Sequence, residues 1–270
     1  MSTAINKCRI SGSKSFVPVV DLGHQALTGV FPKTASETVP TAPLELLWSP
    51  ESGLVQLRHS VEPEVMYGEN YGYRSGLNPT MVNHLQRKVR WLEDSYGTED
   101  FNVVVDVGSN DGTLLNSYRS KNLVRVGFDP VAGKYLDYYH EGARVVPDFF
   151  SSSAFLGLGS GKAKIITSIA MFYDLEDPIG FVRQISDSLL PEGVWHFEQS
   201  YLPAMLRTTS YDTICHEHLE YYSLSVVQKI LALNGLRILD VQTNSINGGS
   251  FAVTAAFEGS SHEANDPVID

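Results

Sequence analysis

Apolar runs and amphipathic stretches alternate along the chain from position 81 onward. Residues 81–96 are apolar at spacings of three and four, which places these side chains on one face of a helix. The runs that follow are continuously apolar, as in strands covered on both faces. This alternation predicts a doubly wound α/β fold with a mostly parallel sheet. We expect strands at 103–107, 123–129, 144–146, 164–171, 194–198, 236–243 and 249–257, and helices at 177–190 and 224–234.

The pattern before position 81 is different. Short β-like runs at 17–22, 44–48 and 54–59 are separated by prolines and turn residues. We therefore expect a small β-rich domain at 1–80, an α/β domain at 81–258, and a polar, mobile tail at 259–270. No apolar run approaches the length of a membrane span, and no internal repeat is present.

Composition and charge narrow the possible functions. The chain has 270 residues, of which 43% are hydrophobic and 19% charged, and a net charge of −11. This acidic balance disfavours non-specific binding to nucleic acid or to an anionic membrane. The two cysteines, Cys8 and Cys215, are too few for a disulfide framework, and the N-terminus lacks the apolar core of a signal peptide. We expect a cytoplasmic protein that acts on a small-molecule substrate; its oligomeric state stays open.

The most informative motif is Asp106-Val-Gly108-Ser-Asn-Asp111-Gly112, which follows the first strand of the expected sheet. We predict a strand, a glycine-bearing turn and then a helix. Gly108 and Gly112 would let the backbone approach a ligand closely, whereas two aspartates would repel a pyrophosphate. A ligand with a positive charge and an amino-acid group fits better. No Gly-x-Gly-x-x-Gly follows any strand, which disfavours a dinucleotide oxidoreductase.

This motif resembles motif I of the class I S-adenosylmethionine-dependent methyltransferases. The resemblance implies a Rossmann-like fold and S-adenosylmethionine as the cofactor. Asp129, at the end of the second strand, is the candidate acceptor for the ribose hydroxyls. By the same resemblance, adenine is expected beside Asp148 and Phe149. The expected cofactor-binding residues are Asp106, Gly108, Asn110, Asp111, Gly112, Asp129, Pro130, Asp148, Phe149, Ser168 and Met171.

A narrower resemblance covers almost the whole chain. Seven phrases, at 20–27, 53–57, 67–76, 171–178, 198–201, 211–222 and 247–251, occur in the order typical of sugar C-methyltransferases. These enzymes act on nucleotide-linked (dTDP-type) 4-keto-deoxysugars. The family is described as an N-terminal zinc-binding domain, a central cofactor domain and a C-terminal domain, of which this chain covers the first two. The resemblance implies a zinc-ribbon-like N-terminal domain. It leaves open whether the chain is catalytically active without the third domain.

The zinc ligands of that family are largely replaced. Two Cys-x-x-Cys pairs are typical, and the matching positions here are Cys8, Ser11, Ser49 and Ser52. A neutral hydroxyl is a poor zinc ligand, so we expect no bound zinc and a less stable lobe. The sequence leaves an alternative open: the serines were introduced, or were selected because they avoid oxidation, and the fold of the lobe is retained.

Methylation of a carbon beside a ketone requires a general base, for which histidine is well suited. By resemblance, His218 is the candidate base, Glu217 orients it or binds substrate, and His216 packs nearby. The phenol of Tyr73 would donate to the developing oxyanion. Further substrate contacts are expected from Tyr71, Arg74, Cys215, Tyr222 and Asn247, with cysteine at a position where many relatives carry tyrosine.

Other interpretations of the same residues stay open or are disfavoured. His216-Glu-His218 does not match the metal-binding His-Glu-x-x-His, so we expect no metal there. A cysteine hydrolase that uses Cys215 lacks supporting context. Two alternatives stay open: a protein that binds S-adenosylmethionine without catalysis, and an O- or N-methyltransferase of another small molecule.

Overall fold

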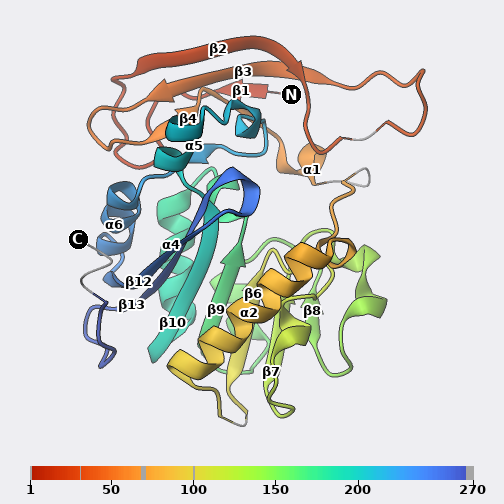
Figure 1. The fold of residues 1–270 in the computed structure, drawn as a ribbon, viewed down its shortest axis with the longest axis vertical. Coiled ribbons are helices and arrows are strands. Elements are labelled where there is room, and N and C mark those ends of the chain that lie inside the picture. The colour runs from red at the N-terminus through yellow and green to blue at the C-terminus, as the bar shows by residue number, and fades with distance from the viewer. Residues whose placement is uncertain (1, 31, 68–70, 100, 266–270) are drawn as a thin grey trace.

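The computed structural model describes residues 2–30, 32–67, 71–99 and 101–265. Its centre is a seven-stranded sheet with the strand order β12-β13-β10-β9-β6-β7-β8 (Figure 1). The five strands from β10 to β8 run parallel, and β13 pairs antiparallel with both β10 and β12. The sheet consists of β6 (Val103–Val107), β7 (Val124–Phe128), β8 (Arg144–Val146), β9 (Ala163–Ile169), β10 (Leu189–Ser200), β12 (Leu236–Asn244) and β13 (Ser250–Phe257). The predicted α/β class with a mostly parallel sheet is confirmed.

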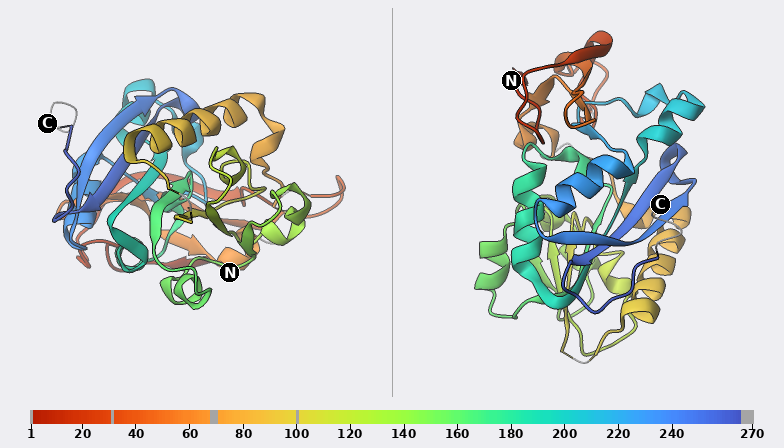
Figure 2. Two further views of the ribbon diagram at one scale, coloured as in Figure 1. Left: turned by 90° about the horizontal axis from the view of Figure 1, so that it is seen from below. Right: turned by 90° about the vertical axis from the view of Figure 1, so that its left-hand side faces the viewer.

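Helices cover both faces of this sheet, as two views at right angles show (Figure 2). Along β6, Val103, Val105 and Val107 belong to one buried cluster and Val104 to another, because successive side chains of a strand point to opposite faces. The first cluster receives α4 (Pro178–Ser188) and α6 (Leu224–Ala232); the second receives α2 (Pro79–Tyr96). These contacts form the hydrophobic core that holds the sheet.

Local signals explain where α2 begins and ends. The side chain of Asn78 accepts hydrogen bonds from the amides of Thr80 and Met81, and Pro79 occupies the first turn. Gly97 follows the last turn with φ 66°. The expected helix at 81–96 is therefore present and starts two residues earlier. The remaining short helices are α1 (Pro63–Met66), α3 (Ser152–Gly157) and α5 (Leu202–Thr208), with single 3-10 turns at Ser75–Leu77, Leu115–Ser117, Ala132–Lys134, Leu136–Tyr138, Phe172–Asp174, Tyr211–Thr213 and Ile246–Gly248.

The N-terminal lobe is built on a four-stranded antiparallel sheet of order β11-β4-β3-β2. Its strands are β2 (Val17–Ala26), β3 (Thr41–Trp48), β4 (Val55–Leu57) and β11 (Glu220–Tyr221), and β1 (Ser2–Ala4) pairs with β5 (His59–Val61) beside them. The β-rich character is as expected. However, β11 comes from far along the chain, so the lobe is completed by a segment beyond position 81.

Three local expectations are wrong. The motif after β6 continues into turns and a single 3-10 turn instead of a helix, because Asn110 and Gly112 have φ of 49° and 76°. β10 runs from Leu189 to Ser200 through the expected break at 191–193, with a register irregularity there. Residues 259–265 of the tail are packed: the amide of Asn265 donates to Leu239 O at 2.7 Å. Residues 266–270 lie outside the described residues, as do positions 68–70 of the phrase at 67–76.

In the described part of the chain, no helix is long and apolar enough to cross a membrane.

Candidate active site

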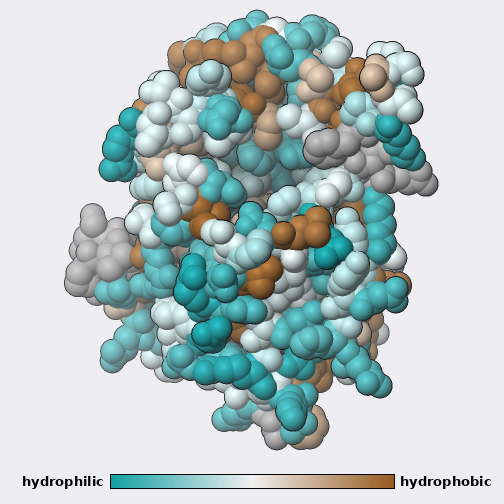
Figure 3. All heavy atoms as spheres, turned by 45° about the vertical axis from the view of Figure 1, so that its right-hand side comes forward, coloured by the Kyte–Doolittle hydropathy of each residue, from teal (hydrophilic) through white to brown (hydrophobic). Residues whose placement is uncertain are grey.

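A cavity of about 300 Å³ lies at the carboxyl ends of β6, β7 and β9, between the sheet and the N-terminal lobe. In open α/β sheets, ligands bind at this edge, and the volume is within the range of small-molecule sites. The space-filling view shows that the surface is indented between the lobe at the top and the body below (Figure 3). Both parts contribute to the wall, since Met66 and Tyr67 of the lobe face residues that follow β6 and β7.

Eight of the eleven expected cofactor-binding residues line this cavity. They come from four separate segments that meet only in the folded chain. The eight are Asp106, Gly108, Asn110, Asp129, Pro130, Asp148, Phe149 and Met171.

Asp129 is buried at the end of β7, and its carboxylate is held by two backbone amides. The amide of Asn110 donates to Oδ2 at 2.9 Å, and that of Val131 donates to Oδ1 at 2.8 Å. Burial raises the pKa of Asp129, while these two hydrogen bonds counteract the rise. Each carboxylate oxygen retains acceptor capacity, so the group can still bind ribose hydroxyls.

Asp106 ends β6 on the cavity wall and is bonded to the neighbouring strand. Thr167 Oγ1 donates to its Oδ1 at 2.6 Å. Burial raises the pKa of Asp106 to about 7, against the effect of this hydrogen bond. Gly108 follows, and a Cβ added there would lie 3.2 Å from Met171 Cγ, so glycine permits the two segments to pack closely.

Three expected cofactor residues lie outside the cavity wall. Asp111 Oδ2 accepts a hydrogen bond from the amide of Gly76 at 2.9 Å. Gly112 packs against the ring of Tyr139. Ser168 is fully buried and accepts a hydrogen bond from Trp195 Nε1 at 3.1 Å. These contacts with other parts of the chain keep the three residues from the cofactor cavity.

A segment that we call the strap, residues 71–76, crosses over the motif turn. Asn110 Oδ1 accepts from the amide of Ser75 at 3.0 Å, and Asn110 Nδ2 donates to Tyr73 O at 3.1 Å. Tyr71 and Tyr73 of the strap line the cavity, as expected. Arg74 was expected to bind substrate; instead it pairs with Asp111 and stacks over the ring of Tyr138.

The far end of the cavity carries the expected catalytic segment. Glu217 lines the wall, and its Oε1 is buried without a hydrogen-bond partner. Burial raises the pKa of this carboxyl group. The loop at Gly29 of the N-terminal lobe presses against it, since a Cβ at that position would overlap Glu217 Oε1. His216 also lines the cavity, while its Nε2 donates to Ala42 O at 3.1 Å.

His218 lies beside the cavity but does not line it. Its Nδ1 is 3.0 Å from Thr213 O. Because a carbonyl only accepts, Nδ1 carries the proton and Nε2 keeps a free lone pair. Burial lowers the pKa of His218 to about 4, so the ring is neutral at pH 7. A nitrogen of this ring, the Glu217 carboxylate and Cys215 Sγ lie within 4.8 Å of one another.

The other expected substrate residues are not on the cavity wall. Cys215 is buried, which raises the pKa of its thiol to about 12. Tyr222 is also fully buried, with its ring stacked on Phe172 at 5.2 Å between centroids. Asn247 lies in the turn before β13 with φ 51°. Tyr222 belongs to the hydrophobic core, whereas Cys215 lies beside Glu217 and His218 behind the wall.

Several polar residues of the cavity wall were not among the expected site residues, and two of them are Asp174 and Tyr67. Asp174 lies three residues after Met171, in the 3-10 turn that follows β9, and Tyr67 begins the segment before the strap. Asp174 could have been found from its place after the fourth parallel strand, where ligand-binding side chains gather. Tyr67 had no comparable signal, because its position depends on how the lobe packs.

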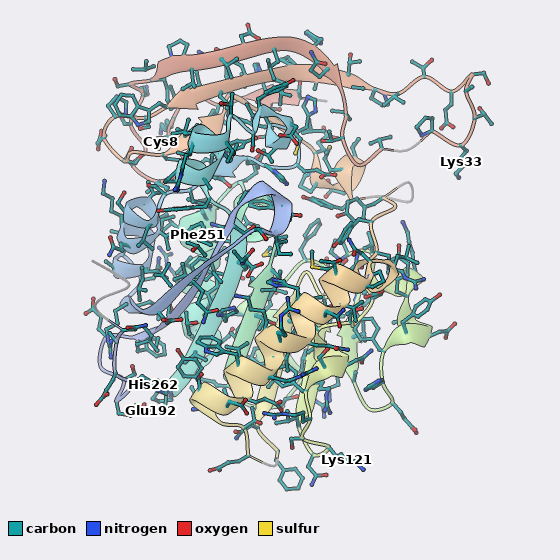
Figure 4. All side chains as sticks on the ribbon, in the orientation of Figure 1. Cys8, Lys33, Lys121, Glu192, Phe251 and His262 are labelled. Carbon is teal, nitrogen blue, oxygen red and sulfur yellow. The ribbon has the colours of Figure 1, made fainter. Side chains whose placement is uncertain are left out.

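The four positions that match the family's zinc ligands meet in the N-terminal lobe, where Figure 4 labels Cys8. Cys8 Sγ is 3.2 Å from Ser52 Oγ, and Ser49 is fully buried with an unpartnered hydroxyl. Burial would raise the pKa of the Cys8 thiol, but the neighbouring hydroxyls of Ser49, Ser52 and Ser11 lower it to about 7. A single thiolate among three hydroxyls does not fit a structural zinc.

The fold and the cavity together define an α/β protein of the class I methyltransferase type. Comparison with protein families agrees: residues 81–241 match a family described as "Methyltransferase domain", and residues 8–67 match one described as "Putative zinc binding domain". The chain belongs to the S-adenosylmethionine-dependent methyltransferases that carry this N-terminal domain.

Individual relatives agree with this class. The C-methyltransferase NovU of Streptomyces niveus is 29% identical over 272 residues, which cover 98% of this chain and 64% of that protein. The chain thus spans less than two thirds of the length of this relative. The plantazolicin methyltransferase BpumL, solved with a desmethylPZN analogue and SAH, aligns with a TM-score of 0.51 at 14% identity, over 67% of this chain and 86% of that one. LepI in complex with SAM aligns with a TM-score of 0.50 at 13% identity, over 68% and 54%. Both structures show the shared fold.

Proposed function

We propose that this enzyme methylates a carbon beside the keto group of a nucleotide-linked, dTDP-type 4-keto-deoxysugar. One observation carries the proposal: Glu217, whose Oε1 is unpartnered among the described residues, lines the end of the cavity that the expected cofactor residues line, and a ring nitrogen of the neutral His218 lies within 4.8 Å of its carboxylate. The seven ordered sequence phrases and the likeness to a C-methyltransferase support it further.

The residues on the cavity wall fit S-adenosylmethionine. Asp129 would hold the ribose hydroxyls, Asp148 and Phe149 the adenine, and Asp106 with Gly108 the amino-acid end. When bound, the cofactor supplies an electrophilic methyl group on a positively charged sulfur. The carboxyl groups of Asp106 and Asp129 in the wall suit the positive charge of the sulfur. Among the described residues that line the cavity, none is lysine or arginine, so no cationic side chain of the wall repels that charge.

The protein's own task is to make the substrate carbon nucleophilic. A base must take a proton from that carbon, and its electron pair then forms the enolate whose charge rests on the keto oxygen. We assign the base to the pair Glu217 and His218, with His218 Nε2 as the acceptor and Glu217 as its neighbour on the wall. Tyr71 and Tyr73, from the strap, would donate to the oxygen.

The test is transfer of a labelled methyl group from S-adenosylmethionine to a dTDP-4-keto-6-deoxysugar, together with exchange of solvent deuterium into that sugar. We expect both signals, and we expect His218→Gln to reduce both while leaving cofactor affinity unchanged. Transfer without exchange would favour the O- or N-methyltransferase alternative. Cofactor binding with neither signal would favour the binding protein without catalysis.

For the N-terminal lobe, at about residues 1–80, we propose a fold that needs no zinc. Cys8 retains the one thiol of the family's set, and the surrounding serines replace coordination bonds by hydrogen bonds. Contacts of Arg9 with two strands of the lobe compensate for the missing metal: Arg9 donates to Leu57 O of β4 at 2.9 Å and lies 3.4 Å from Glu220 of β11.

A further inference from the structure

Asp174 carries a buried carboxyl oxygen that makes no hydrogen bond of good geometry with any described residue, although the Tyr67 hydroxyl lies beside this carboxyl group. Its backbone is fixed, because its amide donates to Met171 O at 3.1 Å within the 3-10 turn after β9. Its side chain lines the cavity, yet Oδ1 is buried and makes no hydrogen bond of good geometry. Buried polar atoms without a partner are rare in folded proteins and call for an explanation.

Three other polar atoms of residues in the same wall share this condition. Tyr67 Oη, His216 Nδ1 and Glu217 Oε1 are all buried and make no hydrogen bond of good geometry with the part of the chain that the structure describes. Four such atoms therefore belong to residues, from three separate segments, that line one cavity. A ligand that brings its own oxygen atoms can bond to groups of this kind, which packing alone does not satisfy.

The charges around Asp174 favour its neutral, protonated form. Glu217 belongs to the cavity wall and Glu220 to β11, and the cation beside Glu220, Arg9, is already engaged by Glu220 and Glu176. Burial is the largest cause that raises the pKa of Asp174 well above its ordinary value, and the charges of Glu217 and Glu220 add to the rise. A hydrogen bond with the Tyr67 hydroxyl, the second-largest influence, opposes it. A protonated carboxyl group is a hydrogen-bond donor, which an ionised one is not.

We propose that Asp174, in its protonated form, is a further catalytic residue that donates a hydrogen bond to the keto oxygen of the substrate as the enolate forms. This rests on the proposed C-methylation. The base takes the proton from carbon, the electron pair moves toward the oxygen, and the Asp174 proton is shared with that oxygen without leaving the protein. A carboxylic acid that stays neutral in an apolar site is a known way to build an oxyanion donor.

The division of roles between two carboxyl groups follows from their surroundings. Glu217 lies within 4.8 Å of the ring nitrogen of His218, so a proton that it gains can be passed on. Asp174 is not a member of that group, and the phenols Tyr67 and Tyr71, which donate rather than accept protons, are close enough to interact with it. Two titratable groups in different environments are thus suited to acid and base roles.

Three variants of the whole chain test the assignment. Asp174→Asn keeps the shape and a donor, Asp174→Ala removes both, and Asp137→Asn alters an exposed acid outside the cavity as the control. We expect Asp174→Ala to reduce deuterium exchange and methyl transfer by about 10²-fold, and Asp174→Asn by less than about 10-fold. Calorimetry should give unchanged S-adenosylmethionine affinity for all three. An Asn variant as inactive as the Ala variant, or an Ala variant with full exchange, overturns the proposal.

A second readout separates this proposal from the proposed function. The infrared difference spectrum between wild type and Asp174→Asn at pH 7 reports the protonated carboxyl group without any substrate. A band of a neutral carboxylic acid that is lost in the variant supports the donor role even if the sugar tested is the wrong one. An ionised Asp174 at pH 7 overturns the proposal, whatever the enzyme methylates. Absence of methyl transfer in the wild-type protein, by contrast, overturns the proposed function.

Discussion

Arg74 Nε lies 3.2 Å from Asp111 Oδ2, and its guanidinium carbon lies 4.1 Å from the centre of the Tyr138 ring. The pair joins the strap to the turn after β6, two segments that are distant in the sequence. Asp111 is buried and the Arg74 side chain is 22% exposed, so the contact is partly shielded from solvent. The strap is therefore held to the turn after β6, at the edge of the cavity, by this ion pair as well as by Asn110.

Arg74→Ala should loosen the strap and weaken S-adenosylmethionine binding. A partly buried pair of this kind is worth about 1 kcal/mol, which corresponds to roughly a fivefold rise in Kd. Calorimetry on the purified chain measures the change. Lys121→Ala, an exposed cation at the opposite end of the molecule in Figure 4, is the control and should leave Kd unchanged. Equal affinity in the Arg74 variant would show that the strap is held without the ion pair.

Gly29→Ala should damage catalysis more than folding. Gly29 has φ 78°, and a Cβ there would overlap Glu217, whereas Gly23 has φ 67° and open space around it. Both alanine variants carry backbone strain of about 1 kcal/mol, but only Gly29→Ala displaces the carboxylate. We expect methyl transfer to fall at least about tenfold in Gly29→Ala relative to Gly23→Ala, because misplaced catalytic groups are costly. Similar rates for the two variants would mean that the position of Glu217 is unimportant.

Glu198 should make stability fall in acid. It lies 2.6 Å from His84 Nε2 and 2.8 Å from Lys88 Nζ. Burial would raise the pKa of Glu198, but these two neighbours lower it from 4.5 to about 2. A carboxyl group with a depressed folded-state pKa stabilises the fold above its unfolded pKa, and this contribution is lost as the pH falls from about 4.5 to 2.

The shift corresponds to about 3 kcal/mol, so Glu198→Gln should lose about that much stability at pH 7 in urea unfolding. The difference from wild type should shrink as the pH is lowered below 4.5. Glu51→Gln, at an exposed acid, is the matched control and should differ from wild type by less than about 0.5 kcal/mol. A difference for Glu198→Gln that is constant from pH 7 to 3 would contradict the ion-pair explanation.

Ser11→Cys/Ser49→Cys/Ser52→Cys should create a zinc site in the N-terminal lobe. Together with Cys8, the variant has four thiols at positions that already meet around one point. We expect about one zinc ion per chain by elemental analysis, and a higher melting temperature that a chelator reverses. The same triple variant with Cys8→Ser should bind zinc at least about tenfold more weakly, since it lacks one ligand. Stoichiometric zinc in the wild-type chain would show that the lobe needs metal after all.

Much of the central sheet could be predicted because its signals are local. Four of the five residues of β6 are valine, and Asn78, Pro79 and Gly97 delimit α2 through their own backbone preferences. The expected helix after β6 failed for a local reason too, since Asn110 and Gly112 adopt positive φ. Glycine and asparagine are the residue types that most readily adopt positive φ, so the run Gly108-Ser-Asn-Asp-Gly112 also fits a series of turns.

Only part of the candidate site could be predicted from the sequence. Residues such as Asp129 and Phe149 reach the cavity because they end parallel strands, which the alternation of elements already implies. Whether a side chain at such a strand end binds a ligand or another segment depends on what packs against it. Asp111 was expected at the cofactor, but the strap engages it.

By itself, the sequence determined the parallel sheet, the motif turn and the likeness to sugar C-methyltransferases, because hydrophobic period, turn residues and short motifs are properties of neighbouring positions. Only the tertiary structure decided that β11 completes the N-terminal lobe, that Glu217 rather than His218 lines the cavity, and that Asp174 Oδ1 lacks a partner of good geometry among the described residues. Each of these depends on contacts between segments far apart in the chain. The identity of such a partner is set by packing of the whole molecule and is not encoded near either residue.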